Sequence, residues 1–212
     1  MKGIRLIIFD LDGTLIDAYP AIIRSVNYTL KKLGLPPQDN LTIRRAVGWG
    51  DENLLRPFVK QRDLKRAILI YRKHHHLSLV KDSRLLSGVK RLLTQLKNKG
   101  YKLAVASNRP TKFSHLLIRH LKISCYFDFV LCADRLKNIK PHPEILKKIM
   151  QKLKVKPKET LYVGDMTIDV EAGRGARVRV IAVTTGSSSK AELLKQRPYR
   201  TIRKISALLR FL

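Results

Sequence analysis

From residue 84 onward, short apolar segments alternate with amphipathic helical segments. The predicted strands cover residues 102–106, 128–131, 160–163 and 178–183. The predicted helices cover residues 88–99, 111–121, 143–153 and 167–175, with a last one near 202–210. Repeated strand–helix–strand units imply a parallel sheet with helices on both faces. We therefore expect an α/β fold with a Rossmann-like, doubly wound parallel sheet. The apolar run from Arg5 to Phe9 adds a buried strand to it.

Residues 18–83 interrupt this alternation, because no part of them has the pattern of a strand. Their apolar side chains are spaced for helices, and Pro20 suits a first helical turn. The expected helices cover 20–33, 40–47, 51–60 and 63–79. We expect residues 18–83 to form a small all-helical cap, inserted after the first strand into a core made of residues 1–17 and 84–212.

Polar side chains follow the predicted strands at the points where the strands end. They are Asp10 and Asp12, Ser107 and Asn108, Lys140, and Asp165 and Asp169. The carboxyl ends of parallel strands meet at one edge of a sheet, where open α/β sheets bind their ligands. We therefore expect these side chains to share one crevice.

The acids Asp10 and Asp12 stand two residues apart, where the first strand runs into Gly13. Burial alone would not place carboxylates there, because an unpaired buried carboxylate is costly. One could act as a nucleophile while the other transfers protons. By itself the pair is equally compatible with a strand that ends in an acid-rich loop.

The other polar groups at this edge suit a phosphate and a divalent cation. Ser107 and Lys140 offer a hydroxyl and an ammonium to phosphate oxygens. Asp10 and Asp165 offer the hard oxygen ligands that Mg²⁺ prefers. Asp169, on the first turn of a helix, can orient metal-bound water or pair with Lys140.

The chain is strongly basic, with 44 Lys and Arg against 16 Asp and Glu and a net charge of +28. This charge is compatible with a functional basic surface or with a generally basic proteome. From Ser83 to Phe127 there is no acidic residue. We expect the helices of that stretch to form one positive face, away from the crevice, that binds nucleic acid or other polyanions weakly and incidentally.

The remaining composition indicates a cytoplasmic protein. No apolar run approaches the roughly 20 residues of a membrane span, and the short N-terminal apolar run reads as a strand and not as a secretory signal. Cys125 and Cys132 are interpreted as reduced core thiols. The sequence specifies no oligomeric state.

The order of these motifs resembles the haloacid dehalogenase-like superfamily of phosphotransferases, over nearly the whole chain. The four signatures stand as Asp10-Leu11-Asp12-Gly13-Thr14, Ser107-Asn108, Lys140-Pro141 and Gly164-Asp165-Met166-Thr167-Ile168-Asp169. The cap directly after the first signature resembles that of the phosphoglycolate phosphatase-like branch.

The resemblance implies roles for the catalytic residues. Asp10 would be the nucleophile that forms an aspartyl-phosphate, and Asp12 would protonate the leaving oxygen and later deprotonate water. Ser107 and Lys140 would hold the phosphoryl oxygens. Mg²⁺ would be bound by Asp10, the backbone carbonyl of Asp12, and Asp165. Such a site works by positioning and charge neutralisation.

The resemblance also implies residues around this centre. Thr14 and Asn108 would bind the phosphate, and Asp169 would lie behind the metal ligands. The segment from Arg44 to Gly50 falls where the branch has its substrate-selecting loop. Trp49 in that segment would contact substrate, with a place in the core of the cap as an equal alternative.

The run His74-His75-His76 invites a metal-site interpretation. Adjacent residues of a helix point in different directions, so three in a row cannot converge on one ion. We expect a solvated helix end instead.

These inferences predict a phosphatase that uses Mg²⁺ and acts on a small phosphorylated metabolite, with phosphoglycolate as the leading substrate. The alternatives within the enzyme class are a nucleotide or sugar-phosphate phosphatase, a pyrophosphatase and a β-phosphoglucomutase-like mutase. A non-catalytic polyanion-binding protein is the alternative of a different class.

Overall fold

In a computed structural model of the protein, which describes residues 3–212, six strands form one parallel sheet in the order β5-β4-β1-β6-β7-β8. They are β1 (Leu6–Phe9), β4 (Lys102–Ser107), β5 (Phe129–Cys132), β6 (Thr160–Gly164), β7 (Arg179–Val183) and β8 (Arg200–Ile202). All neighbouring strands in this sheet run parallel. The prediction of a Rossmann-like parallel sheet is confirmed.

The register of the central strands fixes the place of the polar side chains. Phe9 of β1 lies opposite Val105 of β4 and Val163 of β6. These strands are mostly apolar and, apart from Lys102 at the start of β4, buried, as expected for the middle of a parallel sheet. The residues just beyond them, which include Asp10, therefore emerge at the same edge.

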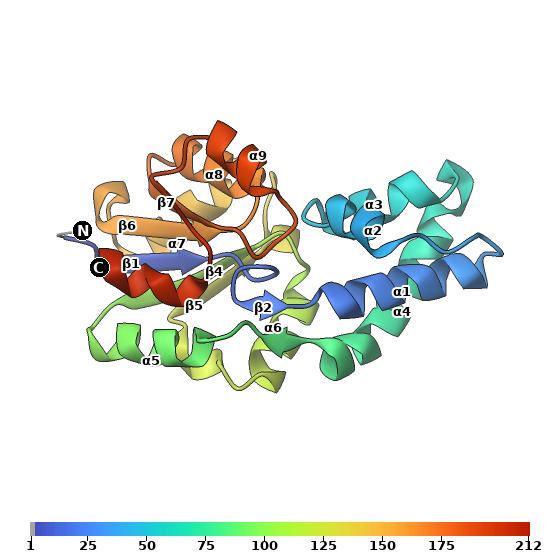
Figure 1. The fold of residues 1–212 in the computed structure, drawn as a ribbon, viewed down its shortest axis with the longest axis horizontal. Helices are drawn as coiled ribbons and strands as arrows, with labels where there is room; N and C mark the ends of the chain where they lie inside the picture. The colour runs from blue at the N-terminus through green and yellow to red at the C-terminus, as the bar shows by residue number, and fades with distance from the viewer. Residues whose placement is uncertain (1–2) are drawn as a thin grey trace.

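Helices cover both faces of the sheet (Figure 1). One face carries α5 (Val89–Asn98), α6 (Thr111–His120) and a C-terminal 3₁₀ helix (Ile205–Phe211). The other face carries α7 (Glu144–Leu153), α8 (Thr167–Gly175) and α9 (Lys190–Lys195). Short 3₁₀ turns connect elements at Ser124–Tyr126, Ala133–Arg135 and Pro157–Glu159.

The cap lies beyond the carboxyl edge of the sheet, at the end of the molecule opposite the two termini (Figure 1). Its helices are α1 (Tyr19–Lys32), α2 (Asn40–Ala46), α3 (Gly50–Leu55) and α4 (Leu64–Asp82). Two short antiparallel strands, β2 (Ile16–Asp17) and β3 (Arg84–Leu85), pair where the chain enters and leaves it. The helical insertion is confirmed; its division from the core at 17/18 and 83/84 stays a prediction.

The expected helix over 51–60 is shorter than predicted. It ends at Leu55, and 3₁₀ turns at Arg56–Phe58 and Gln61–Asp63 lead into α4. Pro57 explains the break, because proline has no N–H to donate to the helix. Helix α2 is capped by Asp39, whose carboxylate accepts from the backbone N–H of Leu41 and Thr42, and not by the expected Asn40.

The C-terminal prediction is wrong in part. The helix expected near 202–210 is preceded by the edge strand β8, and the helical turns from Ile205 are 3₁₀. A strand of three residues is too short to show a period of two. Helix α9 was also missed, although Ser189 and Glu192 form a capping box at its start.

The cysteine interpretation holds for one residue. Both cysteines are free, and Cys132 is buried at the end of β5, but Cys125 is exposed and therefore not a core thiol.

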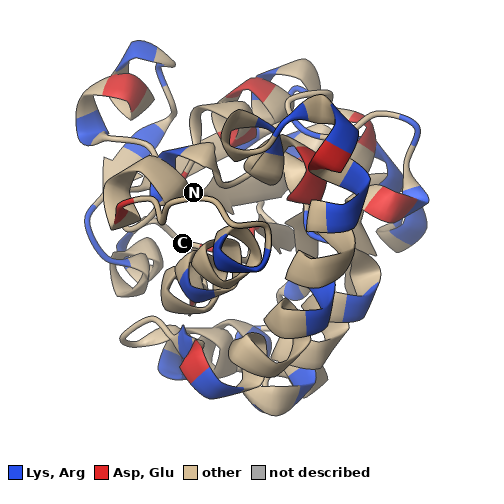
Figure 2. Cartoon of the chain, turned by 90° about the vertical axis from the view of Figure 1, so that its right-hand side faces the viewer, with Lys and Arg blue, Asp and Glu red and all other residues tan. Residues whose placement is uncertain are grey.

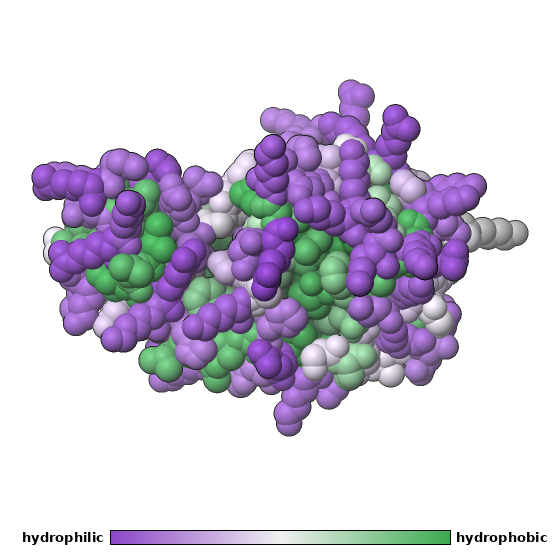
Figure 3. Space-filling model, turned by 180° about the vertical axis from the view of Figure 1, so that it is seen from behind, coloured by the Kyte–Doolittle hydropathy of each residue, from purple (hydrophilic) through white to green (hydrophobic). Residues whose placement is uncertain are grey.

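The surface is dominated by hydrophilic side chains. Lys and Arg are spread over the elements seen from the cap end and outnumber the acids there (Figure 2). From behind, hydrophilic side chains surround apolar areas on both the cap and the core (Figure 3). Among residues 3–212, no helix combines the length and apolar character needed to cross a membrane.

Candidate active site

Lys140 lies at the centre of a buried polar cluster. Its Nζ donates to Asp10 Oδ1 at 2.6 Å, to Asp169 Oδ1 at 2.7 Å and to the Tyr162 hydroxyl at 3.0 Å. The carbonyl of Ala106 lies 3.2 Å away. The Lys140 side chain is only 2% exposed. A buried ammonium with two carboxylate partners is held in one position, from which it can bind an anion.

The cluster shifts the protonation of its members. Burial raises the pKa of Asp10 to about 7, although Lys140 acts in the opposite direction. Burial alone would lower the pKa of Lys140, but Asp10 and Asp169 raise it well above its ordinary value. Lys140 therefore stays charged, whereas Asp10 is only partly ionised at neutral pH unless a further cation comes near.

Asp165 is fully buried beside Asp10. Its Oδ1 accepts from the Thr14 hydroxyl at 2.8 Å, and its Oδ2 accepts from the backbone N–H of Ser187 at 3.2 Å. Gly13 has a φ of +80°, and a Cβ there would lie 2.6 Å from Asp165 Oδ2. Only glycine allows this loop to approach the carboxylate so closely. Burial, and then the charges of its acidic neighbours, raise the pKa of Asp165 well above the usual range.

Three carboxylates of this cluster could hold a metal ion. Ligand atoms of Asp10, Asp165 and Asp169 all lie within 4.8 Å of one another. The Asp169 oxygens already accept from Lys140, from Tyr162 at 2.6 Å and from the Met166 N–H at 3.0 Å. Asp10 and Asp165 are therefore the better ligands, and Asp169 positions Lys140. A divalent cation that prefers oxygen fits this donor set and would offset the repulsion between the acids.

Asp12 forms a bidentate ion pair with Arg109. Nε of Arg109 donates to Asp12 Oδ2 and Nη2 donates to Oδ1, each at 2.8 Å. Nη1 of Arg109 lies 2.8 Å from His75 Nε2, on the cap. The sequence analysis missed Arg109, yet a signal was present: it stands two residues after Ser107 in the same loop at a strand end.

Ser107 is the last residue of β4, and Asn108 follows it. The Ser107 hydroxyl accepts from the Arg109 N–H at 3.1 Å. The Asn108 amide donates to the carbonyls of Gly48 at 2.9 Å and Lys140 at 3.1 Å, and its oxygen accepts from the Lys140 N–H at 3.0 Å. Asn108, in the loop after β4, thus connects this loop to Gly48 of the cap and to the loop that contains Lys140.

The predicted phosphate contacts of Thr14 and Asn108 stay predictions. In this structure the side chains of both residues bond to protein groups, Thr14 to Asp165 and Asn108 to backbone.

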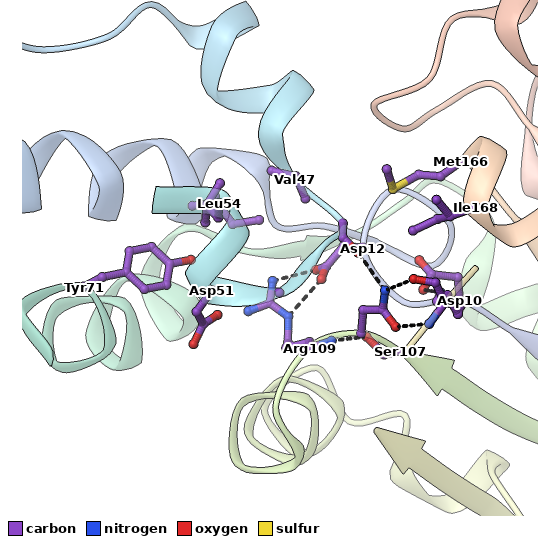
Figure 4. Close-up of a pocket in the computed structure, with 15 residues that line it drawn as sticks. Asp10, Asp12, Val47, Asp51, Leu54, Tyr71, Ser107, Arg109, Met166 and Ile168 are labelled. Atoms are coloured by element: carbon purple, nitrogen blue, oxygen red, sulfur yellow. Dashed lines mark hydrogen bonds and ion pairs between the residues drawn. The ribbon is translucent and has the colours of Figure 1, made fainter. Parts of the chain in front are cut away.

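A small cavity of about 50 Å³ lies between this cluster and the cap. Figure 4 shows side chains from the cap facing those from the core across it. The core contributes Asp10, Asp12, Ser107, Asn108, Arg109, Lys140, Met166 and Ile168, and the cap contributes Ile22, Val47, Gly48, Gly50, Asp51, Leu54 and Tyr71. The predicted convergence in one crevice is confirmed for Asp10, Asp12, Ser107, Asn108 and Lys140. Asp165 and Asp169 lie beside Asp10 but do not line the cavity.

Further contacts hold the cap against the core. Nη2 of Arg44 donates to the carbonyls of Thr185 at 2.8 Å and Gly186 at 3.0 Å. Arg45 pairs with Glu192 at 2.7 Å. The loop after β7 thus joins α2 of the cap, and it also supplies the Ser187 N–H to Asp165.

Trp49 does not line this cavity, although its neighbours Gly48 and Gly50 do. Its side chain is 40% exposed, so the alternative that placed it in the core of the cap is wrong. A contact between Trp49 and substrate stays a prediction.

The expectation of a solvated histidine run is wrong for His75. Helix α4 continues to Asp82, and His75 is fully buried on it, while His76 is exposed. The His75 ring stacks on Tyr71 with 4.7 Å between ring centroids. His75 stands four residues after Tyr71, on the apolar side of the helix, which is the signal that the sequence analysis overlooked.

Three comparisons with known proteins agree on the family to which this chain is similar. The model of the haloacid dehalogenase-like hydrolase family matches residues 7–183. A phosphoglycolate phosphatase of Pseudomonas putida is 32% identical in an alignment of 218 positions, which covers 97% of this chain and 78% of that protein. Another from Aquifex aeolicus is 34% identical and covers 86% of this chain and 85% of its own. A crystal structure of a predicted phosphoglycolate phosphatase from Haemophilus somnus superposes with a TM-score of 0.95 at 28% identity, over 100% of this chain and 99% of that one.

Proposed function

The chain belongs to the haloacid dehalogenase-like hydrolase family and is a phosphatase, and on this premise we propose that it is a Mg²⁺-dependent phosphoglycolate phosphatase. The observation that carries the proposal is the buried group of Asp10, Lys140 and Asp165 beneath a closed cap. It combines a nucleophile and a fixed cation in one small cavity, with the candidate metal ligand Asp165 buried beside the nucleophile.

The first half of the proposed reaction transfers the phosphoryl group to the protein. A carboxylate oxygen of Asp10 bonds to phosphorus while the bond from phosphorus to the ester oxygen breaks. Asp12, protonated at this stage, gives its proton to the leaving oxygen. Lys140 and Ser107 hold the phosphoryl oxygens, so that charge is neutralised and the reacting atoms stay in line.

The second half returns the protein to its starting state. Asp12 takes a proton from water, the water oxygen bonds to phosphorus, and the bond to Asp10 breaks to release phosphate. Asp169 positions Lys140 throughout, through the 2.7 Å ion pair.

Mg²⁺, bound by Asp10, the Asp12 carbonyl and Asp165, would supply positive charge that keeps these carboxylates ionised next to an anionic substrate. The buried acids and their raised pKa values support a cation at this place.

The size of the cavity favours a small substrate. At about 50 Å³ it is well below the roughly 300–1,000 Å³ of sites for larger ligands. A nucleotide or a sugar phosphate would require the cap to move away, against the contacts of Arg44, Arg45 and Asn108. A two-carbon ester such as phosphoglycolate requires the smallest displacement of the cap.

A substrate panel tests the proposal. Phosphate release would be measured with Mg²⁺ for phosphoglycolate, adenosine monophosphate, glucose 6-phosphate and pyrophosphate, and isomerisation would be measured for β-glucose 1-phosphate. We expect the highest kcat/KM for phosphoglycolate. A higher value for a nucleotide, a sugar phosphate or pyrophosphate would replace the proposed substrate, and isomerisation without phosphate release would identify a mutase.

Trp49 is proposed to act on substrate choice through the loop that it shares with Gly48 and Gly50. Trp49→Ala should change the order of substrates in this panel. Because the side chain is 40% exposed, the melting temperature should fall by no more than about 4 °C, the shift that about 1 kcal/mol causes in a chain of this size. Thermal unfolding and the panel would be measured on the same variant. A preserved order with a large fall in melting temperature would contradict this role.

The basic face is proposed to be incidental to catalysis. Helices α5 and α6 lie on the same face of the sheet, as expected. Lys90, Arg91 and Lys99 are exposed, whereas Lys97 pairs with Asp128 at 3.0 Å.

Changing Lys90, Arg91 and Lys99 to Glu should weaken retention on heparin and leave phosphoglycolate hydrolysis unchanged. Retention depends on counterion release and falls with salt, whereas the reaction occurs at the edge of the sheet. Lys97 is left in place because Glu there would face Asp128. A parallel loss of hydrolysis would give the basic face a part in function.

The two free cysteines support a cytoplasmic location, where thiols stay reduced.

A further inference from the structure

Two cationic side chains line the cavity among the residues that the structure describes, Lys140 and Arg109. Lys140 lies against Asp10, where the phosphoryl group would bind. Arg109 points from the start of the loop after β4 toward Asp12, on the side where the cap residues Asp51 and Tyr71 lie (Figure 4). A phosphate ester with a second anionic group would therefore meet Arg109 with that group.

The geometry of Arg109 suits a carboxylate in particular. Its Nε and Nη2 each lie 2.8 Å from a different oxygen of Asp12. This parallel two-point arrangement is the one in which a guanidinium recognises a planar carboxylate. The Arg109 side chain is only 7% exposed, so the pair is largely shielded from water.

The guanidinium is also held from the other side. Nη1 of Arg109 lies 2.8 Å from His75 Nε2. The Ser25 hydroxyl donates its hydrogen to the Ala21 carbonyl and lies 3.2 Å from His75 Nδ1. Because that hydrogen is already used, the hydroxyl oxygen accepts from Nδ1. His75 Nε2 then accepts from Arg109. Burial, and then Arg109, lower the pKa of His75 well below its ordinary value, which keeps the ring neutral for this task.

These contacts create a conflict for Asp12. Its proposed task is to exchange a proton with the leaving oxygen, yet both of its oxygens accept from Arg109. An aspartate with both oxygens bound by one guanidinium has neither oxygen free to contact the leaving group. Something must replace it on Arg109 before the first half of the reaction.

We propose that Arg109 binds the carboxylate of the substrate, which takes the place of Asp12 on the guanidinium and frees Asp12 for the leaving oxygen. This inference rests on the proposed function, because it requires a substrate with a carboxylate close to the ester. His75 keeps the guanidinium in position during the exchange. A substrate without a carboxylate leaves Asp12 bound to Arg109 and is hydrolysed slowly.

The test compares phosphoglycolate with ethyl phosphate, which has a methyl group in place of the carboxylate. The ratio of their kcat/KM values would be measured for the wild type and for Arg109→Met. Arg24→Met serves as the matched control, since it removes an arginine that pairs with Asp82 at 3.0 Å within the cap. We expect a ratio on the order of 100 for the wild type and the control, as a desolvated charge pair of this kind implies. In Arg109→Met the ratio should fall to near 1.

Each other outcome is decisive. If the wild type hydrolyses phosphoglycolate but Arg109→Met slows both substrates by the same factor, Arg109 only positions Asp12, and the inference fails while the proposed function stands. A wild-type ratio near 1 overturns the inference without any variant. If the wild type hydrolyses neither substrate, the proposed function fails and the inference fails with it. If Arg109→Met does not fold, as judged by circular dichroism, Arg109→Lys replaces it, and an unchanged ratio there contradicts the two-point contact.

Discussion

Asp10→Asn is expected to lower kcat by at least about 1,000-fold, because loss of a nucleophile removes an interaction made only during the reaction. An amide of the same shape cannot accept the phosphoryl group. Steady-state phosphate release from the purified variant measures the effect. Asp63→Asn, at a partly exposed acid of the cap, is the matched control and should keep the wild-type rate.

The same variant should fold normally. Lys140 keeps Asp169 and Tyr162 as partners, so the substitution leaves no unpaired buried cation. It also removes a buried carboxylate whose pKa is raised to about 7. In the metal-free protein this carboxylate opposes folding as pH rises from 4 toward 7, because the unfolded chain ionises more easily. The melting temperature of metal-free Asp10→Asn at pH 7 should therefore equal or exceed that of the wild type. Retention of more than about a tenth of the wild-type rate would contradict the mechanism.

Removal of divalent metal is expected to abolish activity, and this is the second largest effect. Asp10 and Asp165 are buried together and both have raised pKa values. Without a metal ion, only part of Asp10 is ionised at neutral pH, and the charge that develops on the phosphoryl group is not neutralised by a metal ion. Excess chelator should stop phosphate release, and Mg²⁺ or Mn²⁺ should restore it.

Ca²⁺ provides the control for charge alone. It carries the same charge as Mg²⁺ but accepts a looser and larger set of oxygen ligands, so it should bind and inhibit. Rates would be measured with each metal added to the chelated protein. Full activity in excess chelator would show that the carboxylates work without a metal ion. Equal activity with Ca²⁺ would show that ligand geometry has no part.

Most of the site could be predicted because it follows from sheet topology. Asp10 and Lys140 are 130 positions apart, yet a parallel sheet brings the ends of its strands to one edge. The buried register of β1 with β4 and β6 then leaves little freedom in where Asp10, Ser107 and Asp165 emerge.

The parts that were missed depend on how the cap sits on the core. The contact between Arg109 and His75 joins a core loop to helix α4, and no local pattern encodes the position of one relative to the other. Strand β8 was missed for a different reason, since its pairing with β7 is long-range and its three residues carry no period of their own.

The central claim is that Asp10 carries the phosphoryl group between the two halves of the reaction. Borohydride added during turnover of phosphoglycolate reduces an acyl phosphate to an alcohol, and peptide mass spectrometry then locates the product. The account predicts homoserine at position 10, dependent on substrate and missing in Asp10→Asn. Unmodified Asp10 under conditions of rapid turnover, or reduction at another acid, would contradict it.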